Sequence, residues 1–200
     1  MTNTLSDRIA PLKPYKALIF DCDGTLADTM PGHFAAWVAA LRVGGGDITE
    51  ERFYQNAGVT SAAIIDALNK DFGYGLDIPT TVEAKEQMYV EGLHEIEEIT
   101  AVADIARAHA GKVPMAVASG GLRSVVHATL DVISLRPLFD AVVTAEDVVH
   151  GKPAPDIFLR AAELLGVAPE DCIVYEDGDP GIVAARAAGM RVIDVRVLWR

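Results

Sequence analysis

A decapeptide near the start of the chain, KALIFDCDGT (Lys16–Thr25), carries its strongest structural signal. The first half is a short apolar run, which is typical of a strand buried within a sheet. Asp21 and Asp23 follow this run directly, and Gly24 lets the backbone turn sharply behind them. We therefore predict a buried strand over 16–20 whose carboxyl end carries two acidic side chains.

Four further apolar runs predict strands of the same kind. They cover Val113–Ala118, Ala141–Val143, Cys172–Tyr175 and Val192–Val195. Helical patterns lie between them: apolar residues recur at helical spacing over 157–165, and an alanine-rich stretch covers 182–188. Each of these patterns ends at a glycine, which is a common helix stop. Alternating strands and helices predict an α/β fold, a doubly wound parallel sheet with helices on both faces.

The stretch over 28–97 interrupts this alternation, because its apolar residues recur only at helical spacing. One stripe comprises Phe34, Trp37, Val38 and Leu41, and another comprises Ile64, Ile65 and Leu68. A helical block inserted after the first strand is expected to cover the sheet as a cap. We therefore predict an α/β core formed by residues 1–27 and 98–200, and a small helical cap domain formed by residues 28–97.

Composition and charge narrow the range of partners. A chain of 200 residues is long enough for one compact domain with an insertion. The formal net charge of −12 argues against nucleic acid and anionic membrane as partners, since both would be repelled. The start of the chain has no signal-peptide pattern, and no apolar run reaches the roughly 20 residues that cross a bilayer. Cys22 and Cys172 form no CxxC pair, which suits a reducing compartment. We expect a cytoplasmic protein.

A second acidic pair, Glu176-Asp177, closes the strand predicted over 172–175. Ligands of open parallel sheets bind at the carboxyl ends of the strands. If two such ends are neighbours, four carboxylates converge, and they repel one another unless a cation bridges them. Oxygen ligands in that number favour Mg²⁺. The alternative interpretation of Asp21 and Asp23 is an acidic turn that merely ends a strand.

Two other segments could bind an anion. Ser119-Gly120-Gly121 follows the strand predicted over 113–118 and offers a hydroxyl and backbone N–H groups to phosphate oxygens. Lys152 lies in a proline-rich loop before a helix, where a fixed positive charge could neutralise a phosphate and steady a nucleophilic aspartate. Taken singly, a serine such as Ser119 is more often a solvated turn residue, and a lysine such as Lys152 is more often an exposed surface charge. Their order relative to the two acidic pairs favours a phosphate site.

That ordered set resembles the haloacid dehalogenase superfamily, whose four motifs correspond to Asp21-x-Asp23-Gly-Thr, Ser119, Lys152 and Glu176-Asp177. The resemblance covers the chain from about residue 15 and implies a Rossmann-like core. It also implies that Asp21 attacks phosphorus to give an aspartyl-phosphate, which water then hydrolyses. Asp23 would act as general acid and then as general base. Ser119 and Lys152 would bind the transferring phosphoryl group.

The same resemblance implies a Mg²⁺ site. Asp21, the backbone carbonyl of Asp23 and Asp177 would bind the ion, and Glu176 would support it. Thr25 and Gly120 are assigned to the substrate-binding set, with Thr25 helping to position its loop.

The position of the predicted cap matches the subgroup with a small helical cap. Within it, Asp28-Thr29 followed by His33-x-x-Ala36-Trp37 resembles β-phosphoglucomutases and bacterial fructose-1-phosphate phosphatases, and the stretch over 176–190 looks most like the phosphatases. By that resemblance His33 and Lys85 reach the substrate from the cap. Lys85 is otherwise a solvated lysine on a helix face, and Trp37, on the same helix face as His33, is as readily a core residue. The mutases bind a second phosphate with an arginine and a lysine, and the matching positions here hold Ser61 and Leu122. Arg123 is the nearby cation that could compensate.

We therefore predict a Mg²⁺-dependent phosphatase acting on a small phosphorylated metabolite, a sugar phosphate similar to fructose 1-phosphate. We expect it to be a monomer or a weak homodimer. The alternatives are a β-phosphoglucomutase-type phosphomutase and a non-catalytic phosphate-binding module. Dehalogenation is chemically close, but dehalogenases lack an acid at the position of Asp23 and need no metal, so Asp23 and the pair Glu176-Asp177 argue against it.

Overall fold

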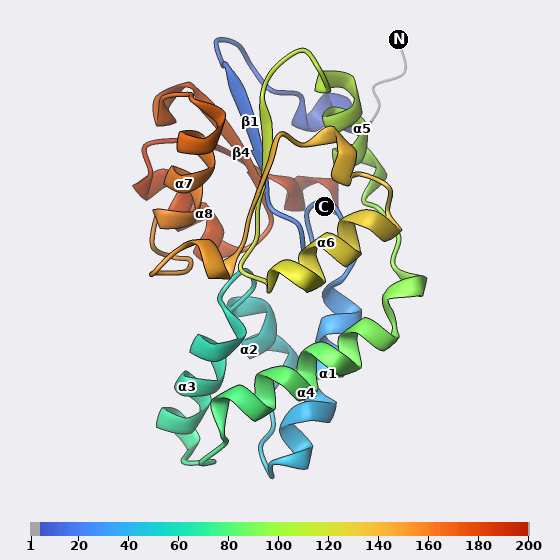
Figure 1. Cartoon of the computed structure of the whole chain (residues 1–200), viewed down its shortest axis with the longest axis vertical. Coiled ribbons are helices and arrows are strands. Elements are labelled where there is room, and N and C mark those ends of the chain that lie inside the picture. Colours follow the sequence, from blue (N-terminus) through green and yellow to red (C-terminus); the bar gives the residue numbers. More distant parts are fainter. Residues whose placement is uncertain (1–4, 200) are drawn as a thin grey trace.

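The first predicted strand lies at the centre of a five-stranded parallel sheet in the computed structural model, which describes residues 5–199 (Figure 1). The order of the strands is β3-β2-β1-β4-β5. Their bounds are Ala17–Phe20 (β1), Met115–Ala118 (β2), Ala141–Val143 (β3), Cys172–Glu176 (β4) and Arg191–Asp194 (β5). The predicted α/β fold is confirmed, with every predicted strand present.

Helices cover both faces of this sheet because its strands are apolar on both sides. One face is covered by α5 (Thr100–His109) and α6 (Arg123–Val132), and the other by α7 (Asp156–Leu165) and α8 (Asp179–Ala187). Successive side chains of β1 alternate between two apolar clusters. Leu18 and Phe20 pack under α5 and α6, whereas Ala17 and Ile19 pack under α7 and α8.

The register of the three central strands brings their carboxyl ends to one edge of the sheet. Phe20 lies opposite Val117 of β2 and Tyr175 of β4. The Phe20 and Tyr175 rings stack with centroids 4.8 Å apart, and the backbone N–H of Asp21 donates to the carbonyl of Tyr175. The residues that follow β1, β2 and β4 are therefore neighbours, although long segments of the chain, including the four-helix insertion, separate them.

Some helix and strand bounds differ from those expected. α7 ends before Gly166 as predicted, with this glycine in the left-handed conformation (φ 65°). α8 begins at Asp179 and not at 182, because Pro180 suits the first turn of a helix. β5 ends one residue earlier than predicted, since Val195 begins a short 3₁₀ helix. The described 3₁₀ helices are Ser6–Ile9, Leu93–Glu95, Arg136–Leu138, Ala145–Asp147, Pro169–Asp171 and Val195–Leu198.

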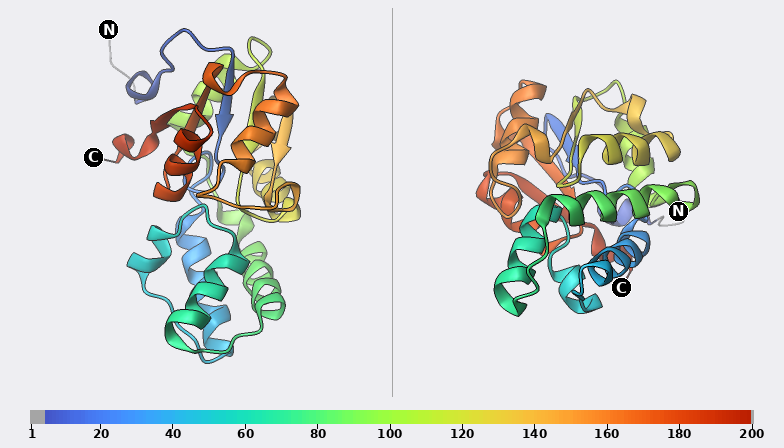
Figure 2. Two further views of the ribbon diagram at one scale, coloured as in Figure 1. Left: turned by 90° about the vertical axis from the view of Figure 1, so that its left-hand side faces the viewer. Right: turned by 60° about the horizontal axis from the view of Figure 1, so that its bottom comes forward.

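Four helices between β1 and α5 form a separate lobe at the carboxyl edge of the sheet (Figures 1 and 2). They are α1 (Met30–Val43), α2 (Glu50–Gln55), α3 (Ser61–Phe72) and α4 (Ile78–Glu91). Both predicted stripes contribute to its apolar cluster, in which Trp37 and Leu41 of α1 pack with Ile65 and Leu68 of α3. No helix among residues 5–199 is both long enough and apolar enough to cross a membrane.

Two short linkers join this lobe to the sheet, and they run side by side. Ala27 and Glu98 form an antiparallel bridge. The N–H of Asp28 donates to the carbonyl of Glu97, and the N–H of Ile99 donates to that of Leu26. We propose that residues 28–97 constitute the cap and 1–27 with 98–200 the core, the ends of which (1–4 and 200) lie outside the described residues.

Candidate active site

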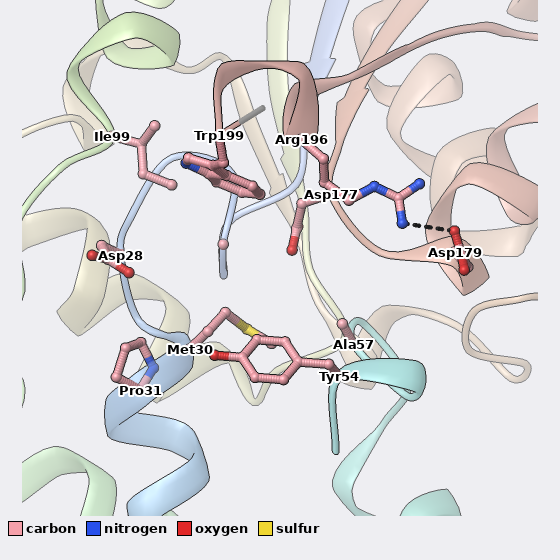
Figure 3. Close-up of a pocket in the computed structure, with 11 residues that line it drawn as sticks. Asp28, Met30, Pro31, Tyr54, Ala57, Ile99, Asp177, Asp179, Arg196 and Trp199 are labelled. Carbon is pink, nitrogen blue, oxygen red and sulfur yellow. Dashed lines mark hydrogen bonds and ion pairs between the residues drawn. The ribbon is translucent and has the colours of Figure 1, made fainter. Parts of the chain in front are cut away.

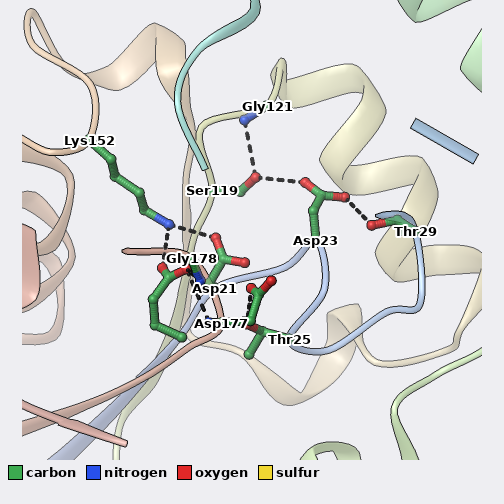
Figure 4. A network of polar contacts seen from close by, with 10 residues as sticks. Asp21, Asp23, Thr25, Thr29, Ser119, Gly121, Lys152, Asp177 and Gly178 are labelled. Atoms are coloured by element: carbon green, nitrogen blue, oxygen red, sulfur yellow. Dashed lines mark hydrogen bonds and ion pairs between the residues drawn. The ribbon is translucent and has the colours of Figure 1, made fainter. Parts of the chain in front are cut away.

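Lys152 and Asp21 form a buried ion pair at the carboxyl edge of the sheet (Figure 4). The Lys152 ammonium lies 2.6 Å from Oδ1 of Asp21 and 2.8 Å from Oε2 of Glu176. Although burial lowers the pKa of Lys152, the charges of Asp21 and Glu176 raise it well above its usual range. The lysine is therefore a permanent cation with two carboxylate partners, and it is not an exposed surface charge.

Asp177 completes the acidic cluster and is held in place by Thr25. The Thr25 hydroxyl donates to Oδ1 of Asp177 at 2.9 Å, and both side chains are buried. A side chain at Gly24, whose φ is +81°, would meet Oδ2 of Asp177 at 2.4 Å. The turn after β1 therefore requires glycine both for its backbone conformation and for the close approach of this carboxylate.

Glu176 is fixed in the same way by the loop that begins α8. Its Oε1 accepts hydrogen bonds from the backbone N–H groups of Asp177 and Gly178. A Cβ atom at Gly181 would lie 2.1 Å from the Glu176 carboxylate, so only glycine fits against it. Both oxygens of Glu176 thus have hydrogen-bond partners before any ion is present.

The acidic cluster fits a divalent cation. Asp21, Glu176 and Asp177 each offer an oxygen within 4.8 Å of the others. With Lys152 as the counter-charge, three carboxylates leave two negative charges in a buried space, and such charges are costly without a partner. Burial and then the charge of Glu176 raise the pKa of Asp177 to about 7, and the same two causes raise that of Asp21. Carboxylate oxygens are ligands that suit Mg²⁺.

The Asp23 carboxylate belongs to a second group of contacts, on the side that faces the cap (Figure 4). Its Oδ1 accepts from the Thr29 hydroxyl at 2.9 Å and lies 3.0 Å from Nε2 of His33. Its Oδ2 accepts from the Ser119 hydroxyl at 3.3 Å. Burial raises the pKa of Asp23, but the attraction of His33 and the hydrogen bonds from His33 and Thr29 outweigh it, so that pKa lies below its usual range.

The loop between α2 and α3 brings the cap into contact with the core at two glycines. A Cβ atom at Gly120 would lie 2.4 Å from the carbonyl oxygen of Gly58, and one at Gly178 would lie 2.7 Å from that of Ala57. Gly58 also lies against the Lys152 side chain. In this conformation the cap is closed over the strand ends.

The cap contributes a buried polar group of its own. The Lys85 ammonium donates to Oε1 of Glu86 at 3.0 Å, and the Ser61 hydroxyl donates to the same oxygen at 3.0 Å. Lys85 also lies over the rings of Trp37 and Tyr89. It is therefore not a solvated helix-face lysine, and Trp37 both packs in the cap core and faces this ammonium.

Two cavities reach the strand ends from different sides. The first, of about 60 Å³, lies between cap and core, and Asp21, Asp23, Ser119, His33 and Lys85 are among its lining residues. The second, of about 480 Å³, exposes the Asp177 carboxylate together with mainly apolar side chains such as Met30, Tyr54 and Trp199 (Figure 3). Asp21 is thus approached from the cap side and Asp177 from the linker side.

The structure brings the predicted site residues together in two adjoining groups. The first group surrounds the acidic cluster and comprises Asp21, Lys152, Glu176, Asp177 and Thr25. The second group surrounds the Asp23 carboxylate and comprises Asp23, Ser119 and His33. Gly120 and Lys85 line the small cavity with the second group. Thr29, Gly58 and Glu86 also belong to this region and were not predicted from the sequence. The only sequence feature that could have indicated Glu86 is its position next to Lys85. No feature of the neighbouring sequence indicated that Gly58 would contact the core.

A family model described as haloacid dehalogenase-like hydrolase matches residues 15–189. Fructose-1-phosphate phosphatase YqaB of Escherichia coli K12 is 39% identical over 184 residues, which cover 92% of this chain and 98% of that protein. Hexitol phosphatase A of the same organism is 33% identical over 193 residues, covering 90% and 82% respectively.

A solved structure shares the fold over nearly the same length. It is a variant of CbbY from Rhodobacter sphaeroides in complex with xylulose-(1,5)bisphosphate. It superimposes with a TM-score of 0.81 at 27% sequence identity, covering 90% of this chain and 86% of that one.

Proposed function

The chain belongs to the haloacid dehalogenase-like hydrolase family and is a phosphoric monoester hydrolase, and on that premise we propose that it is a Mg²⁺-dependent sugar phosphatase that forms an aspartyl-phosphate on Asp21. The observation that carries the proposal is the ion pair of Asp21. Lys152 binds Oδ1 of this carboxylate, and among residues 5–199 no hydrogen bond falls on Oδ2. One oxygen is therefore held while the other is free to attack phosphorus.

In the first step, Asp21 forms a bond to phosphorus and the bond from phosphorus to the sugar oxygen breaks. Asp23 lies on the cap side, where the leaving sugar emerges, and its proton passes to the sugar oxygen. A bound phosphate dianion raises the pKa of the neighbouring Asp23 by charge repulsion, which allows this carboxyl to carry the proton it donates. The Thr29 hydroxyl holds the Asp23 side chain in place.

In the second step, water attacks phosphorus and Asp23 takes its proton, so that phosphate leaves and Asp21 is regenerated. The Ser119 hydroxyl and the backbone around Gly120 bind the phosphoryl oxygens, and Lys152 offsets their charge. Asp21, the carbonyl of Asp23 and Asp177 would hold Mg²⁺, with Glu176 supporting them. When bound, the ion supplies positive charge that offsets the charge of the transferring phosphoryl group.

The position of Arg123 favours a phosphatase over a phosphomutase. A mutase must bind a second phosphate, and Arg123 was the cation that could replace the missing basic residues. Its guanidinium instead pairs with Asp147 at 2.6 Å, and it does not line the small cavity between cap and core. The relatives YqaB and hexitol phosphatase A, whose names denote phosphatases of sugar or hexitol phosphates, support the same choice.

Phosphate release from a panel of sugar phosphates, with and without Mg²⁺, tests the proposal. The panel comprises fructose 1-phosphate, sorbitol 6-phosphate, glucose 6-phosphate, β-glucose 1-phosphate and the generic substrate p-nitrophenyl phosphate. We expect Mg²⁺-dependent release from one or a few of the sugar phosphates. Conversion of β-glucose 1-phosphate to glucose 6-phosphate without release would establish the phosphomutase instead. No release from any member, p-nitrophenyl phosphate included, would refute the phosphatase.

A further inference from the structure

We infer that Glu86 selects substrates whose end remote from the phosphate carries hydroxyl groups and no charge. The inference rests on the proposed function and narrows its substrate class to monophosphates of neutral sugars and polyols. It concerns a residue of the cap that takes no part in the chemical steps described above.

Glu86 faces the place where the sugar must lie. It belongs to α4, is 7% exposed, and lines the same small cavity as Asp23 and Ser119. Because the phosphoryl group binds at the strand ends, the sugar attached to it extends from there toward the cap.

The hydrogen bonds of Glu86 leave half of its carboxylate for a ligand. Lys85 and Ser61 both donate to Oε1. Among residues 5–199 no hydrogen bond falls on Oε2. A carboxylate oxygen accepts hydrogen bonds and donates none, so it needs a donor, and the donors that sugar and polyol phosphates offer at this end are hydroxyl groups. Such bonds to a charged acceptor are stronger than those between neutral groups.

The charges of the cap cancel at this cavity. Among the described residues, Lys85, Glu86 and His33 are the cap's ionisable side chains that line it, and burial and then the charge of Lys85 lower the pKa of His33, which favours its neutral form. Lys85 and Glu86 form an ion pair whose side chains are 5% and 9% exposed. A second phosphate or a carboxylate at the far end of the substrate therefore meets no net positive charge. It also meets the Glu86 carboxylate in a poorly hydrated space, where repulsion between like charges is strong.

Rejection of a second anion is a property of this cap and does not extend to every related protein. The CbbY structure that shares this fold holds xylulose-(1,5)bisphosphate, a ligand with a phosphate at each end. Proteins of this fold therefore differ in whether they accept a substrate with one or two anionic groups. In this chain the Lys85–Glu86 pair lies where it can exclude the second anionic group.

Matched substrate pairs test the inference on the unaltered protein. Sorbitol 6-phosphate and 6-phosphogluconate differ at the far end, where a hydroxymethyl group replaces a carboxylate. Fructose 1-phosphate and fructose 1,6-bisphosphate differ by a second phosphate. We expect kcat/KM with Mg²⁺ to favour the uncharged end at least about tenfold in whichever pair is turned over. Equal or faster hydrolysis of the anionic members would overturn the inference.

The variant Glu86→Gln then assigns this selectivity to its residue. It leaves the Lys85 ammonium without a counter-charge, so the preference for the uncharged end is expected to fall about tenfold or more. Glu83→Gln makes the same change at an exposed position of the same helix and should keep the wild-type preference. The double variant Lys85→Met/Glu86→Gln restores a neutral cap and should reject the anionic substrates more strongly than Glu86→Gln does.

These outcomes separate the inference from the function on which it rests. If wild-type protein hydrolyses neither sugar phosphates nor p-nitrophenyl phosphate, the proposed function fails. If it hydrolyses them and Glu86→Gln keeps the wild-type preference, only the inference fails. Loss of a buried partner can destabilise the single variant. Thermal melting shows whether Glu86→Gln is destabilised. If it is, the double variant and the matched substrate pairs test the inference in its place.

Discussion

Lys152 shows how one side chain can connect distant parts of the sequence. Its ammonium contacts Asp21, 131 positions earlier, and Glu176, 24 positions later. It neutralises part of the charge of the buried carboxylates and restrains one oxygen of Asp21. The remaining members of the site are held by equally specific contacts, such as the hydrogen bond from Thr25 to Asp177. Single substitutions can therefore change the chemistry without changing the fold.

At this scale we predict that Asp21→Asn abolishes turnover. The amide is a poor nucleophile, whereas its carbonyl oxygen can still accept the hydrogen bond from Lys152, and one negative charge is removed from the cluster. We expect kcat on the best sugar phosphate to fall at least about 10³-fold, with little change in the thermal melting temperature. Phosphate release measures kcat, and circular dichroism measures the melting temperature. A variant with activity near that of the wild type would refute Asp21 as the nucleophile.

At the scale of elements, three loops determine how the cap meets the core. The loop between α2 and α3 lies against the loop after β2 at Gly120 and against the loop after β4 at Gly178. In both places a backbone carbonyl of the cap occupies the space of an absent side chain. Closure of the cap therefore depends on glycines whose backbone conformation is otherwise unremarkable, since neither has a positive φ.

We predict that Gly120→Ala prevents full closure. Its Cβ atom would meet the carbonyl oxygen of Gly58 at 2.4 Å, and this is a backbone atom that cannot rotate away. We expect kcat/KM for sugar phosphates to fall about tenfold or more, because the cap then neither excludes water nor aligns the sugar. Gly32→Ala in α1 is the control, since its Cβ atom would make only ordinary contacts, the nearest at 3.7 Å. Equal activities of the two variants would contradict the role of this contact.

At the scale of the whole molecule, we expect the acidic cluster to couple ion binding to stability. When all three carboxylates are ionised, they and Lys152 carry a net charge of −2 at the junction of β1, β4 and the loop before α7. A divalent ion that binds the folded chain and not the unfolded one stabilises it by mass action. The raised pKa of Asp177 makes this coupling depend on pH.

We predict that Mg²⁺ raises the melting temperature, and more so at pH 8 than at pH 5. At 100 times its dissociation constant the ion contributes about 2.7 kcal/mol, or about 5–10 °C for a chain of this size. Without the ion, the folded state holds a proton on Asp177 up to about pH 7, whereas the unfolded state loses it near pH 4. The contribution of this group to stability is thus present at low pH and is lost as pH rises to 7.

Calorimetric scans at both pH values measure this effect, with NaCl at matched ionic strength as the control. Protonation of Asp177 competes with ion binding, so the shift caused by Mg²⁺ should be smaller at pH 5. An equal shift from NaCl, or a larger shift at pH 5, would contradict a Mg²⁺ site that includes Asp177.

Much of this protein could be predicted because the signals are local. A strand buried on both faces is apolar along most of its length, so β1, β2 and β4, which are buried throughout, were visible as short runs. Motif residues follow those strands directly, and parallel strands bring their carboxyl ends to one edge. Asp21, Ser119 and Glu176 could therefore be assigned to one site before any contact was known. Helix bounds were less certain, as the early start of α8 shows, because a proline can begin a helix as readily as end one.

Only the tertiary structure shows which of these residues are in contact and which surfaces of the site are charged or neutral. The burial of Lys152 between two acids, the neutral pairing of Lys85 with Glu86, and the approach of Gly58 to Gly120 all depend on segments that meet through packing. No periodicity encodes such contacts, because they arise from the position of the cap against the sheet. The sequence alone thus predicted the fold and the groups that we propose to react, whereas folding in three dimensions determined the surface that we propose to face the substrate.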